Sequence, residues 1–186
     1  MYNNIKNKTL REVLKNVTLF ILVILIVLFI REYVFRVVIS NGDSMSPNIS
    51  HKDVLITSML PYVFGEPEVG DIVIFPYQEN ENDKFIKRVV AKGGDEVDLI
   101  NGVFYINGEK LEDDFNHDIT NTGNLIYPYK IPEGTYFCLG DNRNASKDSR
   151  FLEVGTMKES DFMGKVLFRI YPFNTAFDDL SKNIDY

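Results

Sequence analysis

The sequence predicts a mainly β domain, built as a coiled antiparallel sheet or a partly open barrel, behind one N-terminal transmembrane helix. Two observations carry this prediction. From residue 34 onward, β-branched and aromatic residues recur with a period near two between turn signals, and helical periodicity is scarce. Before that point, residues 17–30 read VTLFILVILIVLFI, a run of 14 residues without a charge.

The uncharged run is shorter than the roughly 20 residues that a membrane-spanning helix needs. Extending it to residues 13–35 gives 23 residues and places Lys15, Arg31 and Glu32 near its ends. Long charged side chains at those places can reach the lipid headgroups. We therefore expect a tail at residues 1–12, a transmembrane anchor at 13–35 and a β-rich domain at 36–186.

Two other readings of this segment are weaker. A cleaved signal peptide would end in a small-x-small site, and residues 31–40 offer no convincing one. A buried core helix would show a polar stripe, which the run lacks. Basic residues dominate the first 16 positions, which predicts that the tail stays in the cytoplasm and the domain lies outside it.

The segments typical of strands alternate β-branched or aromatic residues with polar ones. An Asn101-Gly102 pair between two of them predicts a tight hairpin, and Asn107-Gly108 predicts a second turn. A short helix is expected near residues 159–163. The apolar stretch 60–64 is either core or a loop that dips into the bilayer. The expected strands, in chain order, are 34–40, 53–60, 70–77, 84–92, 96–100, 103–106, 134–140 and 163–172.

Composition excludes several classes of function. The net charge is −7 although the N-terminus is basic, so the domain is acidic and would repel nucleic acid. The single cysteine, Cys138, lies in an apolar strand and is expected to be a buried packing residue. The two histidines, His51 and His117, show no metal-ligand spacing and are expected to be surface or loop residues. No metal or other cofactor is expected.

Two clusters of residues suggest nucleophilic chemistry without histidine. Ser44 lies in Asn-Gly-Asp-Ser-Met-Ser-Pro, where Gly and Pro predict a tight turn that can present a hydroxyl. Lys87 lies in KFIKRVVAK and shares a strand face with Phe85 and Val89, whereas Arg88 points the other way. Burial among apolar side chains would lower the pKa of a lysine, and a neutral amine can act as a general base.

A third cluster, Gly-Asp-Asn-Arg-Asn-Ala-Ser-Lys-Asp-Ser-Arg at 140–150, follows an apolar strand. So dense a set of hydrogen-bonding groups suits a loop that orients a base. Ser146 could contact the lysine amine, and Asp148 could pair with Arg150.

The segments NGDSMSPNI, VGDIVIF, FIKRVVAKGGDEV and GDNRNASKDSR resemble, in order and spacing, the four conserved boxes of the type I signal peptidases. The resemblance covers most of residues 17–170, and the single anchor and modest length resemble the enzymes of Gram-positive bacteria. It implies a Ser44 nucleophile whose own N–H helps bind the oxyanion, a Lys87 base, and Ser146 holding the Lys87 amine. It also implies ion pairs between Asp148 and Arg150 and between Asp141 and Arg88, and shallow apolar substrate pockets formed by Met45, Ile49, Phe85 and Ile86.

Three positions depart from the family pattern. Gly42 stands where some members have a serine that completes the oxyanion hole, Asn48 where threonine is usual, and Ile49 where leucine is usual. The first departure removes a side-chain donor, so a second donor must come from the backbone or from water.

The resemblance implies a membrane-bound serine endopeptidase that removes signal peptides from secreted preproteins on the extracytoplasmic face of the cell membrane. Its expected partners are those preproteins and the lipid bilayer. Two alternatives stay open: a conjugation-type or pilin-type processing peptidase of the same fold, and a catalytically silent membrane-tethered domain that binds signal segments. Self-cleaving Ser/Lys repressor peptidases share a similar β core, but they carry a DNA-binding module where this chain has an apolar segment.

Overall fold

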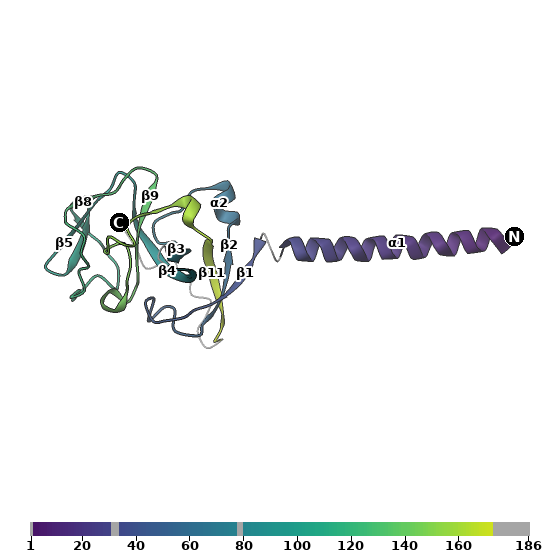
Figure 1. Cartoon of the computed structure of the whole chain (residues 1–186), viewed down its shortest axis with the longest axis horizontal. Coiled ribbons are helices and arrows are strands. Elements are labelled where there is room, and N and C mark those ends of the chain that lie inside the picture. The colour runs from purple at the N-terminus through teal and green to yellow at the C-terminus, as the bar shows by residue number, and fades with distance from the viewer. Residues whose placement is uncertain (1, 31–33, 78–79, 173–186) are drawn as a thin grey trace. The chain divides into compact units, whose positions relative to one another are not determined.

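A computed structural model describes residues 2–30, 34–77 and 80–172 (Figure 1). The chain divides into two units, residues 1–36 and residues 37–186. The first consists mainly of helix α1, Tyr2–Phe29. Its stretch Arg11–Phe29 is long and apolar enough to cross a membrane, and its side chains are exposed. Residues 31–33 of the expected anchor lie outside the described residues.

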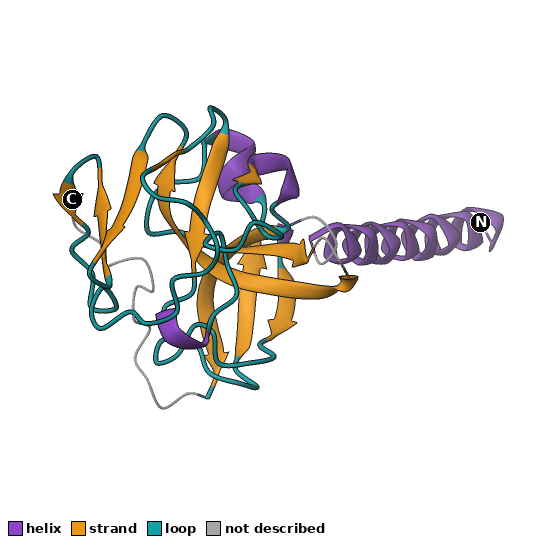
Figure 2. Cartoon of the chain, turned by 60° about the vertical axis from the view of Figure 1, so that its left-hand side comes forward, coloured by secondary structure: helices purple, strands orange, loops and turns teal. Residues whose placement is uncertain are grey.

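The prediction of a mainly β domain is confirmed, because strands dominate the second unit (Figure 2). Its larger sheet has seven strands in the order β1-β2-β11-β3-β4-β9-β10. Their bounds, in that order, are Arg36–Ile39, Val54–Ser58, Gly164–Tyr171, Ile72–Tyr77, Asn80–Lys92, Thr135–Leu139 and Met157–Lys158.

A second, four-stranded sheet has the order β7-β6-β5-β8, and the sequence did not predict this division into two sheets. Its strands are β7 Glu109–Lys110, β6 Val103–Ile106, β5 Glu96–Ile100 and β8 Tyr129–Lys130. The predicted hairpin joins β5 to β6, with Ile100 opposite Val103. Asn101 and Gly102 both have positive φ, at 52° and 75°, as a two-residue hairpin turn requires.

The helices of the domain are short. The stretch 60–64 forms α2, Leu60–Phe64, in which Tyr62 is buried while Val63 and Phe64 are exposed. The helix expected near residues 159–163 is a 3-10 turn, η3, over Glu159–Asp161, and a second 3-10 turn, η2, covers Arg143–Ala145.

Strand β3 explains why the larger sheet has a core on both faces. Its residues alternate, so Val73 and Phe75 pack into one apolar cluster, and Ile72 and Ile74 pack into another. A strand buried on both faces reads as a continuous apolar run, as IVIF does. The third cluster joins the smaller sheet to β4 and β9.

The neighbouring strand β4 repeats this alternation and thereby places the candidate base. Val73 of β3 pairs with Lys87. Phe85 and Val89 face the same cluster as Val73, whereas Ile86 faces the opposite one, as the sequence predicted. The β9 neighbour covers the other edge of β4, so Lys87 lies in the middle of a sheet.

Candidate active site

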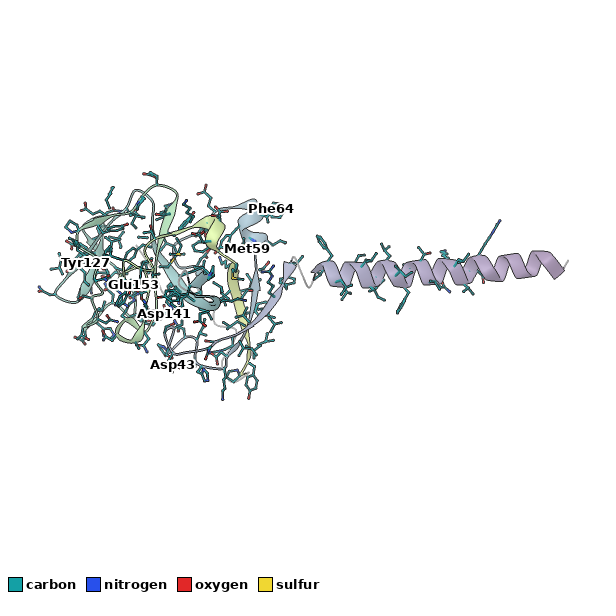
Figure 3. The ribbon with its side chains drawn as sticks, in the orientation of Figure 1. Asp43, Met59, Phe64, Tyr127, Asp141 and Glu153 are labelled. Atoms are coloured by element: carbon teal, nitrogen blue, oxygen red, sulfur yellow. The ribbon has the colours of Figure 1, made fainter. Side chains whose placement is uncertain are left out.

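Two loops meet at the end of the sheet, and backbone hydrogen bonds hold them together. The first loop follows β1 and carries Ser44, and the second is the 140–150 segment. Asn142 N–H donates to the Ser44 carbonyl at 3.0 Å, and the Asn142 side chain donates to the Asp43 carbonyl at 3.1 Å. Figure 3 labels Asp43 on the first loop and Asp141 on the second. The nucleophile candidate is therefore fixed from the second loop.

Lys87 reaches this junction from β4. Its Nζ lies 2.9 Å from Ser44 Oγ and donates to the Ile86 carbonyl at 3.0 Å. The side chain lies over the Phe85 ring, with Nζ 4.7 Å from the ring centroid. Only 2 % of the residue is exposed. The amine and the hydroxyl are thus within hydrogen-bond distance in a site that water scarcely reaches.

Burial sets the protonation of this amine. Desolvation lowers the pKa of Lys87 from 10.5 to about 8, and the Arg150 charge adds to this effect. The negative charge of Asp148 opposes it but is the smaller influence. A substantial fraction of Lys87 is therefore neutral at a pH of 7 to 8, and a neutral amine can take a proton from a hydroxyl 2.9 Å away.

One fully buried ion pair joins the 140–150 loop to β4, and a second lies within the loop. Arg88 contacts Asp141 with both Nε and an Nη, each at 2.8 Å, and donates to the Gly70 carbonyl at 3.0 Å. Arg150 contacts Asp148 at 2.7 and 2.8 Å. These two-point contacts satisfy charges that would otherwise be costly to bury. The Arg88–Asp141 pair fixes the loop against β4, the strand that carries Lys87.

Gly140 allows the close approach of the two loops. Its N–H donates to Asp148 at 3.0 Å. A Cβ at this position would overlap the Ser44 carbonyl oxygen and the Ser146 side chain. Any residue larger than glycine would push the nucleophile loop away from the second loop.

Ser146 lies in this packed region, but the hydrogen bond expected between it and Lys87 is not present. The residue is 2 % exposed, and its Oγ has no hydrogen-bond partner among the described residues. Lys87 Nζ instead uses Ser44 and the Ile86 carbonyl. The proposed role of Ser146 as the residue that holds the amine stays a prediction.

A groove of about 690 Å³ opens beside Ser44 and Lys87. One wall is the segment 37–45, the other is the segment 83–87, and Ala145 and Lys147 complete it. Among the residues expected to bind substrate, Met45, Phe85, Ile86 and Gly42 line the groove. Ile49 does not, because it is fully buried in the core with Leu55 and Ile72.

The sequence did not predict a second set of side-chain contacts that supports the 140–150 loop from behind. Arg143 donates to the Gly140 carbonyl at 3.0 Å and pairs with Asp113 at 2.5 Å. Burial raises the pKa of the Asp113 carboxyl, against the opposing effect of Arg143. The Phe115 ring lies 5.9 Å from the guanidinium carbon of Arg143 and equally far from that of Arg88. No sequence signal links Asp113 or Phe115 to a loop about 30 residues away.

Asn48, one of the departures from the family pattern, joins the buried charges. Its side-chain amide donates to Asp141 Oδ2 at 2.8 Å, and its carbonyl accepts from Arg169 at 2.9 Å.

Among the described residues, no cluster of three or more His, Cys, Asp or Glu side chains is placed to hold a metal ion.

Comparison with known proteins identifies relatives along most of the chain. The sequence model of the family described as "Signal peptidase, peptidase S26" matches residues 11–171. Signal peptidase I S of Bacillus subtilis is 30 % identical over 182 residues, which cover 91 % of this chain and 93 % of that protein. Signal peptidase IB of Staphylococcus aureus strain COL is 30 % identical over 180 residues, which cover 88 % and 92 %. The crystal structure of a signal peptidase I from Enterococcus faecalis is 31 % identical, with a TM-score of 0.46 over 54 % of this chain and 97 % of that one.

Burial of Lys87 predicts a cost in stability that a neutral side chain would remove. Between pH 8 and 10.5 the unfolded chain holds a proton that the folded chain has lost. The free energy of unfolding therefore rises with pH across this window, and the cost of burying the charge is fully present below it. Lys87→Met should raise the free energy of unfolding at pH 6 by on the order of 2 to 3 kcal/mol.

Thermal unfolding of the full chain in detergent at pH 6 and at pH 8 to 10 tests this expectation. The gain should shrink as the pH rises through the window. Lys92→Met, on the exposed end of the same strand, should change stability little at any pH. A Lys87→Met variant that is less stable than the wild type at pH 6 would contradict the account.

Proposed function

Since the chain belongs to the signal peptidase family, peptidase S26, we infer that it removes signal peptides from secreted preproteins as a serine peptidase, and we propose that Ser44 and Lys87 perform the chemistry. The observation that carries the assignment is the partly buried contact of 2.9 Å between Lys87 Nζ and Ser44 Oγ. The pKa of Lys87, lowered to about 8, supports its role as the base.

In this mechanism neutral Lys87 takes the Ser44 proton while the hydroxyl oxygen attacks the carbonyl carbon of the −1 residue of the preprotein. The resulting lysine ammonium then gives its proton to the leaving amine, and the acyl-enzyme remains. Water hydrolyses this ester with Lys87 again as the base, which returns Ser44 and Lys87 to their starting forms.

The developing oxyanion needs donors beside Ser44. We propose that the Ser44 backbone N–H supplies one of them, because the turn presents this N–H next to its own hydroxyl. The Asn142 N–H already binds the Ser44 carbonyl and fixes the turn. Each donor of this kind contributes roughly 3 to 4 kcal/mol of transition-state stabilisation in other acyl-transfer enzymes.

The groove suits an extended substrate strand. Its two walls, 37–45 and 83–87, lie on either side, so a peptide between them could add backbone hydrogen bonds as an extra strand does. Met45, Phe85 and Ile86 would form shallow apolar pockets. The Phe85 ring stacks on Tyr77 with 4.8 Å between centroids, which leaves little depth beneath it. Small side chains at the −1 and −3 positions would fit.

The family is membrane-anchored, and Arg11–Phe29 is the candidate span of this chain. We propose that residues 1–12 lie in the cytoplasm and that the β domain faces outward, as the basic N-terminus favours. We also propose that α2 contacts the bilayer. Phe64, labelled in Figure 3, is 85 % exposed, and its neighbour Val63 is 66 % exposed. Tyr62 is buried and donates to Asp71 at 3.0 Å, which holds the helix in place.

Cleavage of a preprotein by the purified full chain in detergent tests the function and the dyad together. The wild type should release a product that begins after a small residue, as N-terminal sequencing would show. Ser44→Ala and Lys87→Ala should each lower kcat by roughly three or more orders of magnitude, because each removes a group that the chemistry needs.

Two matched variants control for general damage. Ser46→Ala changes a serine two residues from the nucleophile, and Lys92→Ala changes a lysine on the same strand. Both should cleave at close to the wild-type rate. Wild-type cleavage by Ser44→Ala would refute the dyad, whereas a wild type that binds preproteins but never cuts them would favour a silent binding domain.

The contact of α2 with the bilayer can be measured by fluorescence because the chain has no tryptophan. In full chain reconstituted into lipid vesicles, the Phe64→Trp variant should emit at shorter wavelength than in water and be quenched by brominated lipids. Ile126→Trp is the matched control, because Ile126 is 83 % exposed but lies in the loop before β8. Equal quenching of the two variants would rule out the proposed contact.

A further inference from the structure

We propose that His51 is a positioning residue for the nucleophile loop and that the peptidase works best when His51 is neutral. This inference rests on the proposed function of Ser44. It concerns a residue that fits no sequence motif.

A reciprocal pair of hydrogen bonds joins His51 to the two residues that precede Ser44. The Gly42 N–H donates to His51 Nδ1 at 3.3 Å. The His51 N–H donates to the Asp43 carboxylate at 3.2 Å. The turn at 50–52 therefore binds residues 42 and 43 through one side chain from each partner.

We call this pair of hydrogen bonds the His51 clamp. Among the described residues, Gly42 makes no other hydrogen bond. Gly42 has a φ of 118°, a conformation that favours glycine, and a Cβ placed there would meet nothing within 4 Å. Open space therefore lies on the side of Gly42 where a side chain would project. Asp43 is better held, because its carbonyl accepts from Ser46 N–H and from the Asn142 side chain, both at 3.1 Å.

The location gives this bond a functional consequence. Gly42 lines the substrate groove, whereas His51 lies outside it. Gly42 N–H is thus turned toward His51, and this orients the peptide plane at the groove wall two residues before the nucleophile. Losing the bond would let that wall and the Ser44 turn move, although the core beneath would remain intact.

Only one protonation state of the imidazole can make the bond. Nδ1 accepts from Gly42 when the ring is neutral and its proton is on Nε2. Protonation places a second N–H at Nδ1, opposite the Gly42 N–H, and the bond is lost. Histidine is the side chain whose charge changes between pH 5 and 8, so this loss falls in the range where a peptidase can be assayed.

The charged groups around His51 do not compete for the Gly42 N–H. Asp43 faces it from the nucleophile loop and accepts the backbone N–H of His51. On its own turn lie Lys52 and Asp53, and Asp53 pairs with Arg169 of β11 at 2.8 Å.

Substitutions at position 51 can separate the loss of the hydrogen-bond acceptor from the effect of protonating the imidazole. His51→Asn places an oxygen close to the position of Nδ1, and this oxygen accepts at every pH. His51→Leu keeps the bulk and removes the acceptor. His117→Asn is the matched control, because His117 is the other histidine of the chain and is exposed on a different loop.

The measurement is kcat/KM for preprotein cleavage by the full chain between pH 5.5 and 8.5. At pH 8, His51→Asn should match the wild type and His51→Leu should be about two- to tenfold slower, the range for one ordinary hydrogen bond. The ratio of wild type to His51→Asn should fall by a similar factor toward pH 5.5. Because Lys87 is present in both proteins, its own titration cancels in this ratio. A flat ratio, or a His51→Leu variant as fast as the wild type at pH 8, would overturn the proposal.

A second readout does not depend on activity. In the Ser44→Ala full chain in micelles, the Gly42 amide resonance should shift with the same midpoint as the His51 ring, whereas in Ser44→Ala/His51→Asn it should not. A Gly42 amide that ignores His51 titration would overturn the clamp even if cleavage is normal. If the Gly42 amide follows His51 titration but the wild-type chain cuts no preprotein, the hydrogen bonds between His51 and residues 42 and 43 are upheld and the proposed function is refuted.

Discussion

The site depends on the cost of keeping a lysine ammonium out of water. That cost arises because β4 lies in the middle of a sheet, with β3 on one side and β9 on the other, and because Lys87 faces an apolar cluster. A lysine at an exposed edge would keep its proton near neutral pH and could not act as a base. The long apolar strands that build the core therefore also lower the pKa of the amine, so that its neutral form is available near neutral pH.

The remaining buried charges are arranged so that they do not undo this effect. A lone carboxylate near Lys87 would favour the ammonium and raise its pKa. Asp148 is bound by Arg150, and Asp141 by Arg88, in contacts of 2.7 to 2.8 Å. Each acid is thereby matched by a nearby cation, and desolvation stays the dominant influence on Lys87. The Arg88–Asp141 pair also holds the second loop against β4, so that electrostatic balance and positioning come from the same side chains.

What the sequence could predict follows from how local each signal is. The strand face of Lys87, the hairpin at Asn101-Gly102 and the burial of Cys138 depend on alternation and turn chemistry within a few residues, and the structure agrees with them. The contact of Asp113 with Arg143 and that of Gly42 with His51 depend on how loops from separate elements meet, which no local pattern encodes. Family resemblance predicted that Ile49 lines a substrate pocket, but in the structure Ile49 is fully buried in an apolar cluster of the core.

The central claim is that burial lowers the pKa of Lys87 far enough for its neutral amine to be available near neutral pH, and a direct titration of its side chain tests it. The chain would be labelled with carbon-13 at the lysine ε-carbons, and the Lys87 resonance would be assigned by its loss in Lys87→Met. The account predicts that this resonance titrates with a midpoint near 8, well below the ordinary value for a lysine side chain. A Lys87 midpoint above 10 in a chain that cleaves preproteins at its normal rate would contradict it.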